Sequence, residues 1–378
     1  MKRRLLSALL AMGLVVLLLS AACSGSSTTA SKTATTAATS ANSTAASVAT
    51  TSAAATQTSA STVYTLKWAS QNQVTTPPVI YSYRFIDTVE KNSNGRVKFD
   101  RFPGSVLGTD AETCKLLTAG SIDMATVFGT SYGTDMILYN YPTFQLTGNQ
   151  DSLEFNHKIR YEIPETSAIL EAQTAAMNVK FLNCMASGAN GVISRVEATS
   201  LYDLKGKKLG SNRLAKEFQQ FGIDVQSMNL SEIYESLSRG VIDAASMSIS
   251  PMVALKWYEG GKSLMITRDY GAAHVLAINL DTWNKLPTDI QEIISQAAVE
   301  ATSYSSTAED ETMTQNLKTI ESSGVNVLYL PMEECQTLYK AYSQIRWDEV
   351  IFPTAEKQGI LTEAQTLRKY IDQLTWGE

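Results

Sequence analysis

The sequence is poor in the residues that most often build metal and catalytic centres. Its 378 residues include two histidines and four cysteines. Beyond the N-terminal segment the cysteines are Cys114, Cys184 and Cys335, which do not have the spacing of metal ligands. Cys114 falls in an expected helix and Cys184 in an apolar strand, which favours buried free thiols, although one disulfide stays open. We therefore expect no metal and no other cofactor.

An excess of basic residues is also missing. The chain has 31 Lys and Arg against 37 Asp and Glu, a net charge of −6. Lys2, Arg3 and Arg4 lie in a segment that we expect to be removed, and without them the net charge falls to −9. A nucleic-acid partner requires a basic face, so this balance argues against one.

Long apolar runs are absent except at the N-terminus. Residues 5–19 form an apolar run that follows three basic residues and precedes Ser20, Ala21 and Ala22. The run is too short for a comfortable membrane span, and residues 1–22 fit an export signal peptide. Residues 19–23 resemble a bacterial lipoprotein signal, with serine where a large apolar residue is usual. We expect lipid on Cys23, and an ordinary secretory signal is the alternative.

The next segment is built almost entirely from three small residue types. Residues 24–61 are mostly Ser, Thr and Ala, which offer nothing to bury. We expect residues 23–61 to form a disordered tether that holds a folded part above a membrane. The mature chain beyond it is long enough for two lobes of ordinary size.

Residues 202–248 show strands alternating with helices. We expect strands at 207–210, 225–228 and 241–245, and helices at 214–221 and 231–238. Gly222 and Gly240 end the two helices, and Ser231 caps the second. This alternation predicts an α/β fold with a mainly parallel sheet and loops gathered at the strand ends.

The end of this stretch has a second copy upstream. Gly120-Ser121-Ile122-Asp123-Met124-Ala125 matches Gly240-Val241-Ile242-Asp243-Ala244-Ala245 in outline. One copy alone is a common helix-to-strand turn, whereas two distant copies indicate two α/β lobes with a cleft between them. We expect lobe I from 62–187 with 273–312, and lobe II from 188–272 with 313–378.

Many short motifs over residues 63–378 together resemble the DctP-type solute-binding proteins of TRAP transporters. The resemblance rests on their order and spacing, and the main motifs are Asn94-Gly95-Arg96-Val97-Lys98, Phe102-Pro103-Gly104, Tyr141-Pro142, Asp203-Leu204-Lys205-Gly206, Ser231-Glu232-Ile233-Tyr234 and Trp283-Asn284-Lys285-Leu286-Pro287. It implies a two-lobed, periplasmic-binding-protein-like fold with hinge strands and a long helix spanning both lobes, for which 289–321 is the candidate. The implied function is extracytoplasmic capture of a small polar ligand, an organic acid first, for a membrane permease.

The chain departs from this family where an arginine usually binds the substrate carboxylate. The matching position holds Gly210. We expect Arg213, three residues downstream, to take this role through bidentate pairing, with Arg195 as the other candidate. A solvated surface position is the alternative for each arginine. If neither enters the cleft, the alternatives are a neutral ligand or a ligand held by helix termini and amides.

Further candidate ligand contacts follow expected strand ends or line the cleft. They are Gln71, Asn72, Tyr132, Asn190, Asn212, Met247, Ser248 and Trp257, the last as an apolar wall.

The sequence leaves three further functions open. Residues 129–133 fit the Gly-x-Ser-x-Gly pattern of a hydrolase with Ser131 as nucleophile, for which His274 would be the base. The poor helix pattern after Ser131 argues against that enzyme. The second function is that of an ABC-type solute receptor, and the third is that of a structural surface lipoprotein.

Overall fold

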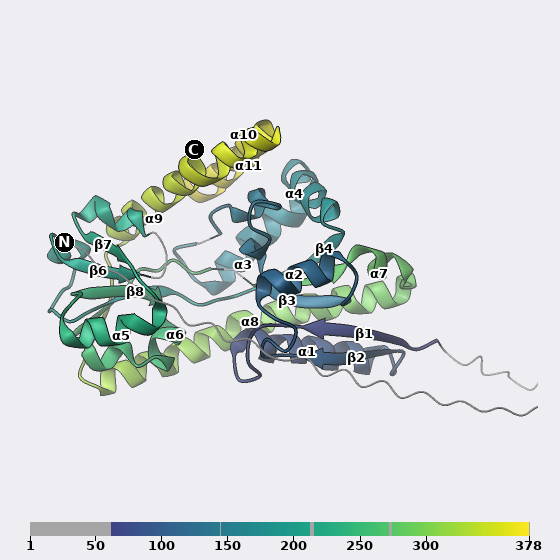
Figure 1. Cartoon of the computed structure of the whole chain (residues 1–378), viewed down its shortest axis with the longest axis horizontal. Helices are drawn as coiled ribbons and strands as arrows, with labels where there is room; N and C mark the ends of the chain where they lie inside the picture. The colour runs from purple at the N-terminus through teal and green to yellow at the C-terminus, as the bar shows by residue number, and fades with distance from the viewer. Residues whose placement is uncertain (1–61, 144, 212–214, 272–273, 378) are drawn as a thin grey trace, which may run out of the picture. The chain divides into compact units, whose positions relative to one another are not determined.

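The computed structural model describes residues 62–143, 145–211, 215–271 and 274–377. The predictions for the signal peptide, the tether and Cys23 lie outside the described residues, as do Asn212 and Arg213. Within the described ranges the chain forms two β-sheets with helices on their faces (Figure 1). The expected α/β class with two lobes is confirmed.

Lobe I is built around a five-stranded sheet in the order β2-β1-β3-β10-β4. Strands β1, β2 and β3 are mutually parallel, and β10 runs antiparallel to both β3 and β4. The strands are β1 (Tyr64–Ala69), β2 (Val97–Phe102), β3 (Met124–Phe128), β4 (Val179–Met185) and β10 (His274–Asn279). The helices are α1 (Pro77–Asn92), α2 (Asp110–Thr118), α3 (Asn149–His157), α4 (Pro164–Ala176) and α7 (Leu280–Lys285).

Lobe II is built around a six-stranded sheet in the order β11-β9-β5-β8-β6-β7. Strand β5 runs antiparallel to its neighbours β8 and β9, and the other pairs are parallel. The strands are β5 (Asn190–Ser194), β6 (Lys208–Ser211), β7 (Asp224–Ser227), β8 (Ala244–Ser248), β9 (Ser263–Ile266) and β11 (Asn326–Tyr329). The helices are α5 (Leu230–Arg239) and α6 (Ile249–Ala254).

The repeated Gly-x-Ile-Asp motif has the same structural role in each lobe. Gly120 and Gly240 have φ values of 68° and 73°, the left-handed conformation that glycine adopts without strain. The carboxylate of Asp123 accepts the N–H of Lys67 in β1, and that of Asp243 accepts the N–H of Lys208 in β6. Each copy therefore ends a helix and fixes the next strand beside its parallel neighbour.

A single long helix belongs to both lobes. Helix α8 (Thr288–Ser322) agrees with the expected 289–321. Ile290 and Ile294 lie in a core of lobe I, whereas Met313 and Ile320 lie in a core of lobe II. Figure 1 shows this helix extending from one lobe into the other.

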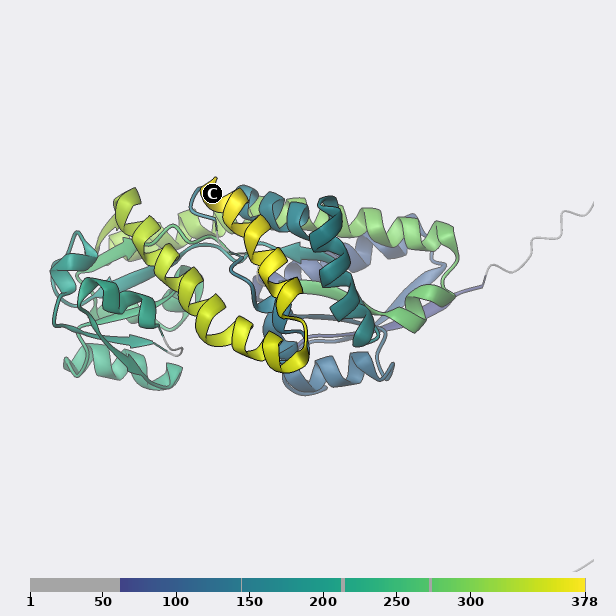
Figure 2. The ribbon, with the colours of Figure 1, turned by 90° about the horizontal axis from the view of Figure 1, so that it is seen from above.

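The C-terminal helices differ from the expected lobe division. Helix α9 (Met332–Ile345) begins against lobe II, where Cys335 and Leu338 join the core. The chain then crosses, and side chains of α10 (Phe352–Gln358) and α11 (Leu361–Trp376) enter the lobe I core. Figure 2 shows these helices passing from one lobe to the other. Residues 347–371 thus pack on lobe I, because their apolar side chains complete its surface beside α4.

Three local expectations also need correction. The region after β6 forms a 3₁₀ helix, Lys216–Phe221, instead of an α-helix. Strand β8 begins three residues later than expected, because the turn with Asp243 takes up residues 241–243. Asn229, and not Ser231, caps α5, forming a capping box with Glu232.

Two general features of the described residues bear on function. The cysteines of the described ranges are buried free thiols, as the sequence analysis favoured, and they are Cys114, Cys184 and Cys335. Over the described ranges, no helix is long and apolar enough to cross a membrane, and His, Cys, Asp and Glu side chains form no cluster suited to a metal ion.

Candidate functional site

One end of the lobe II sheet collects several strand termini, which we call the lobe II edge. Asn190, the first residue of β5, pairs with Ser248, the last residue of β8. Ile266, the last residue of β9, pairs with Gly191. Strand β6 runs parallel to β8, so Ser211 at its end lies at the same edge.

The lobe I sheet has a corresponding edge, which we call the lobe I edge. Ala69, Phe128 and Met185 end three strands that run in one direction, and His274 begins the antiparallel β10. His274 pairs with Phe128 on one side and with Met185 on the other. Carboxyl ends of strands are where open α/β sheets bind ligands.

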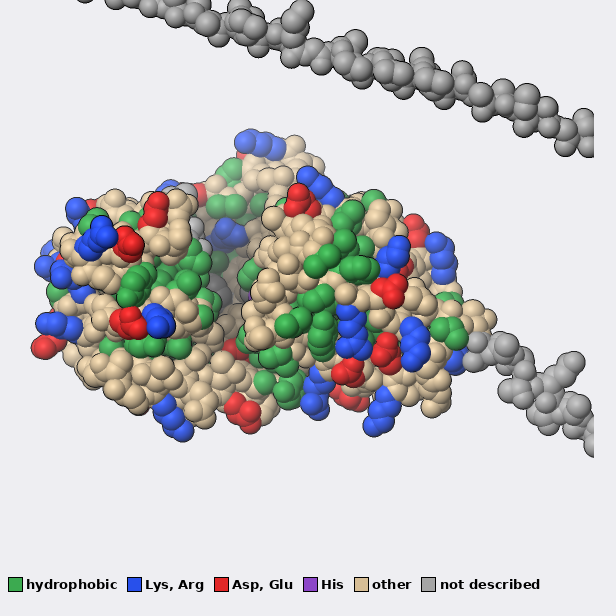
Figure 3. Space-filling model, turned by 60° about the horizontal axis from the view of Figure 1, so that its bottom comes forward, with side chains coloured by type: hydrophobic (Ala, Val, Ile, Leu, Met, Phe, Trp, Pro, Cys, Tyr) green, Lys and Arg blue, Asp and Glu red, His purple; other side chains and the backbone are tan. Residues whose placement is uncertain are grey.

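Short crossing segments join the two edges. Residues 186–189 connect the end of β4 to the start of β5, and a second segment beginning with residues 267–271 follows β9 toward β10. The Ser187 N–H donates to the Gly271 carbonyl at 3.0 Å, so the segments pair with each other. Four residues span at most about 14 Å, so the two edges lie close to each other. Figure 3 shows the surface hollowed between the two lobes.

A polar network occupies the lobe II edge beside the crossing segments. The Asn190 side chain donates to the Asp269 carboxylate at 2.7 Å and accepts from the Ser248 hydroxyl at 2.8 Å. The Thr267 hydroxyl donates to the other oxygen of Asp269. Asp269 is buried and Asn190 half-buried, so this network fixes the geometry of the edge where the two lobes meet.

The expected arginines have different positions. Arg195 follows β5 at the end opposite Asn190, and its guanidinium lies against Gly240. Five residues of strand separate it from the lobe II edge, a distance of about 16 Å, so it lies away from the cleft. Arg213 lies outside the described residues and stays a prediction.

Gly210 lies within β6, where the backbone approaches two side chains. A Cβ atom there would lie 2.6 Å from Ile242 Cδ1 and 2.8 Å from Met228 Sδ. Both distances are shorter than real Cβ contacts, so the space that a side chain would enter is already filled by these two residues.

On the lobe I edge the two predicted loop residues support the local structure. The Gln71 side chain accepts the Asp110 N–H at 2.9 Å, which satisfies a backbone donor at the start of α2. The Asn72 carbonyl accepts the Gly104 N–H at 2.8 Å, which joins the loop after β1 to the loop after β2. Both residues are half-buried, and they bring two loops together at this edge.

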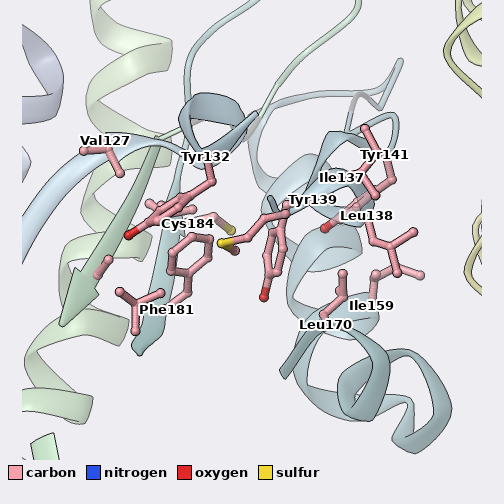
Figure 4. Close-up of a cluster of buried hydrophobic side chains, with 14 of the residues drawn as sticks. Val127, Tyr132, Ile137, Leu138, Tyr139, Tyr141, Ile159, Leu170, Phe181 and Cys184 are labelled. Carbon is pink, nitrogen blue, oxygen red and sulfur yellow. The ribbon is translucent and has the colours of Figure 1, made fainter. Parts of the chain in front are cut away.

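Two other predicted contacts lie in hydrophobic cores. Tyr132 is buried and packs with Phe181 near Cys184 in the lobe I core (Figure 4). Trp257 is fully buried in the lobe II core. Both side chains therefore pack the lobes instead of lining the hollow. Met247 and Ser248, in contrast, are half-buried at the lobe II edge.

Sequence reasoning missed Asp269 and Asp110, and it considered His274 only as a hydrolase base. Asp110 is buried at the start of α2, and its carboxylate accepts the Phe128 N–H at 3.1 Å. Burial raises the pKa of Asp110 above its usual range. The available signals were the positions of Asp269 and His274 close to strand ends and that of Asp110 at the start of a helix.

The hydrolase arrangement is not formed by the described residues. Ser131 lies in a short 3₁₀ turn, Gly129–Tyr132, instead of at the start of an α-helix. Its hydroxyl donates to the Asp110 carboxylate at 3.4 Å, whereas a serine nucleophile requires a histidine base. The His274 ring packs on Phe128 instead.

Two cavities of the described residues lie outside the hollow between the two edges. A cavity of about 10 Å³ lies under the lobe II edge, lined in part by Ser246, Thr267 and Asp269, and has room for roughly one water molecule. A groove of about 620 Å³ lies elsewhere, on the surface of lobe I between α3, β4 and α8. Neither cavity is lined by strand termini from both lobes, so the hollow between the two edges stays the candidate ligand site.

Comparisons with known proteins agree with this architecture. Residues 69–351 match the family model DctP, described as bacterial extracellular solute-binding protein, family 7. The C4-dicarboxylate-binding periplasmic protein DctP of Rhodobacter capsulatus is 24% identical over 296 residues, which cover 77% of this chain and 85% of that protein. The sialic acid-binding periplasmic protein SiaP of Vibrio cholerae is 25% identical over 292 residues, covering 74% and 88%.

A solved structure shares the fold. A TRAP periplasmic solute-binding protein from Ochrobactrum anthropi superposes with a TM-score of 0.68 at 22% identity, covering 84% of this chain and 99% of that one. The family match over residues 69–351, together with the two lobes, identifies an extracytoplasmic solute-binding protein. The chain belongs to the DctP family of these proteins, as the motif order indicated, and this membership favours the TRAP assignment over an ABC-type receptor.

Proposed function

We propose that the protein captures a small organic acid between the lobe I edge and the lobe II edge and delivers it to a TRAP-type permease. The observation that carries the proposal is the pair of facing strand edges, joined by paired crossing segments, within a solute-binding family. Relatives named for C4-dicarboxylates and for sialic acid support an acidic ligand. The protein acts as a receptor and not as an enzyme.

A thermal-shift panel tests the class of ligand. Succinate, malate, pyruvate, a uronate and N-acetylneuraminate represent acids, and glucose and glycine betaine represent uncharged and zwitterionic solutes. A ligand at 100 times its Kd stabilises the protein by about 2.7 kcal/mol, which raises the Tm by a few degrees. We expect at least one acid to do so. A shift confined to uncharged or zwitterionic compounds would contradict the acidic ligand.

We further propose that Arg213 pairs with the ligand carboxylate. A charge-assisted contact contributes about 1.5–3 kcal/mol, so Arg213→Ala should weaken binding of the acid roughly 10- to 150-fold in titration calorimetry. Arg195→Ala is the matched control, since Arg195 lies at the far end of β5. Equal affinities of the Arg213→Ala variant and the native protein would remove Arg213 from the site.

Anchoring at the outer face of the cytoplasmic membrane is the second part of the proposal. The lipoprotein-like residues 19–23 and the tether of residues 23–61 support lipid on Cys23. Stable anchoring takes more than one acyl chain, which bacterial lipoproteins provide. We expect Cys23→Ser to move the protein from the membrane to the supernatant in cell fractionation. Unchanged membrane association would show that the protein is held in another way.

A further inference from the structure

His274 lies at the lobe I edge, on the face of the sheet covered by α1 and α8. It begins β10, and Leu276 and Ile278, two and four residues along the strand, belong to the core under those helices. Side chains two residues apart in a strand share a face, so His274 points to the same side. Because β10 begins at His274, its side chain is the one on this face of β10 that lies nearest the hollow between the lobes.

The environment of the His274 ring is apolar. The ring packs on Phe128, with centroids 4.0 Å apart and planes inclined by 33°. Only 7% of the residue is exposed, and the described residues offer its Nε2 atom no hydrogen-bond partner. Burial lowers the pKa of His274 to about 4, so the imidazole is neutral near pH 7. A buried polar atom without a partner costs stability, so its presence at the edge of the hollow calls for an explanation.

Charged groups on the neighbouring elements are engaged with other partners. Asp110 of α2 accepts the Phe128 N–H and the Ser131 hydroxyl. Glu309 of α8 accepts the Tyr81 hydroxyl of α1 at 3.1 Å. Burial alone accounts for the lowered pKa of His274, so none of these carboxyl groups compensates a charge on its ring.

We propose that His274 contacts the bound ligand, with its Nε2–H donating to an oxygen of the ligand. This inference rests on the proposed function, since it assigns a contact within the same cleft. The ligand supplies the partner that the folded chain lacks, and Phe128 holds the ring in place for it. A carboxylate beside the ring favours the protonated imidazole, so binding of an acid raises the pKa of His274 and takes up protons when the pH falls toward 5.

Two substitutions separate this role from simple packing. His274→Phe keeps a ring against Phe128 and removes the buried nitrogen, so the free protein should hold or raise its Tm, while affinity for the ligand falls about 10- to 150-fold. His274→Gln keeps an N–H donor and should retain part of the affinity. His157→Phe is the control, because His157 is exposed on lobe I and contacts Glu162.

The chain has only two histidines, which makes a direct spectroscopic test possible. Protein labelled with ¹⁵N at histidine gives two sets of imidazole signals, and the His157→Phe variant assigns them. Signals are recorded with each named panel compound that raises the Tm of the native protein, succinate and N-acetylneuraminate first. We expect the His274 signal to shift on binding, and with an acid its titration midpoint to rise from about 4.

The outcomes distinguish this inference from the proposed function. If a compound raises the Tm but leaves the His274 signal unmoved, or binds His274→Phe as tightly as the native protein, the contact is refuted and the receptor function stands. If an uncharged sugar moves the signal and no acid does, the contact stands and the acidic ligand is refuted. A panel in which nothing raises the Tm overturns both.

Discussion

Glu309 places a buried carboxyl group where the long helix meets the crossing segments. A Cβ atom on Gly188, in the first crossing segment, would lie 3.2 Å from Glu309 Oε2. Glu309 Oε1 accepts the Tyr81 hydroxyl, and burial raises the pKa of Glu309 to about 7. The group therefore changes charge near neutral pH beside the chain segments that join the lobes.

This pKa predicts how stability depends on pH. A folded-state pKa above the unfolded value means that the unfolded chain loses its proton first, so stability falls as the pH rises from about 4.5 to about 7. The shift corresponds to about 3 kcal/mol. Glu309→Gln keeps an acceptor for Tyr81 and carries no charge. Denaturation at pH 5 and pH 8 should show a smaller difference for this variant than for the native protein, and an identical difference would refute the assignment.

Gly210 lies in β6 at the position where the sequence resemblance implies an arginine. The space for a side chain is filled by Ile242 and Met228. We expect Gly210→Ala to destabilise the protein by about 1–3 kcal/mol through overpacking, measured by chemical denaturation. Combining it with Met228→Ala should restore part of the loss, because the Sδ atom is then gone. A neutral single substitution would show that the two side chains move aside at little cost.

At the scale of elements, the sequence predicted the features that depend on residues close together in the chain. The apolar spacing from Ile290 onward located α8 within one residue at each end, and the repeated Gly-x-Ile-Asp turn identified both sheets. The apolar stripe of a helix, and the glycine that ends a helix, are both set by residues close together in the sequence. The positions of Gln71 and Asn190 next to strands were predicted for the same reason, whereas their contact with a ligand stays a prediction.

Contacts between distant segments were not predictable in this way. Helix α11 packs against α4 of lobe I, which lies nearly 200 residues earlier in the chain. The sequence of α11 shows that it has an apolar face but not which lobe buries that face. The burial of Tyr132 and the packing of His274 on Phe128 likewise depend on the register between strands far apart in the chain. Sequence patterns within one element do not determine these registers.

The packing of α11 makes a prediction at this scale. Leu367 is fully buried in the lobe I core, so Leu367→Ala should cost about 2–5 kcal/mol. Hydrogen exchange should increase in α4 and in the other segments of that core. The exposed Lys369→Ala on the same helix is the control. Faster exchange confined to lobe II would contradict the assignment of this helix to lobe I.

For the whole molecule, the paired crossing segments and α8 connect the two lobes. Two segments pair at the hinge, and α8 contributes to a core in each lobe. Solute receptors of this architecture close by small backbone changes at such segments. A ligand that touches both edges stabilises the closed arrangement by its extra contacts there.

A distance measurement between the lobes tests this central claim most directly. Val106 on lobe I and Val241 on lobe II are exposed, so Val106→Cys and Val241→Cys provide one spin-label site on each lobe. The described native cysteines are buried, and Cys23→Ser removes the N-terminal cysteine, so the labels attach selectively at these two sites. We predict that the acid identified by thermal shift shortens the distance between the labels in pulsed electron paramagnetic resonance, and that Arg213→Ala reduces this change at equal ligand concentration. An acid that binds tightly and leaves the distance distribution unchanged would contradict capture between the two edges.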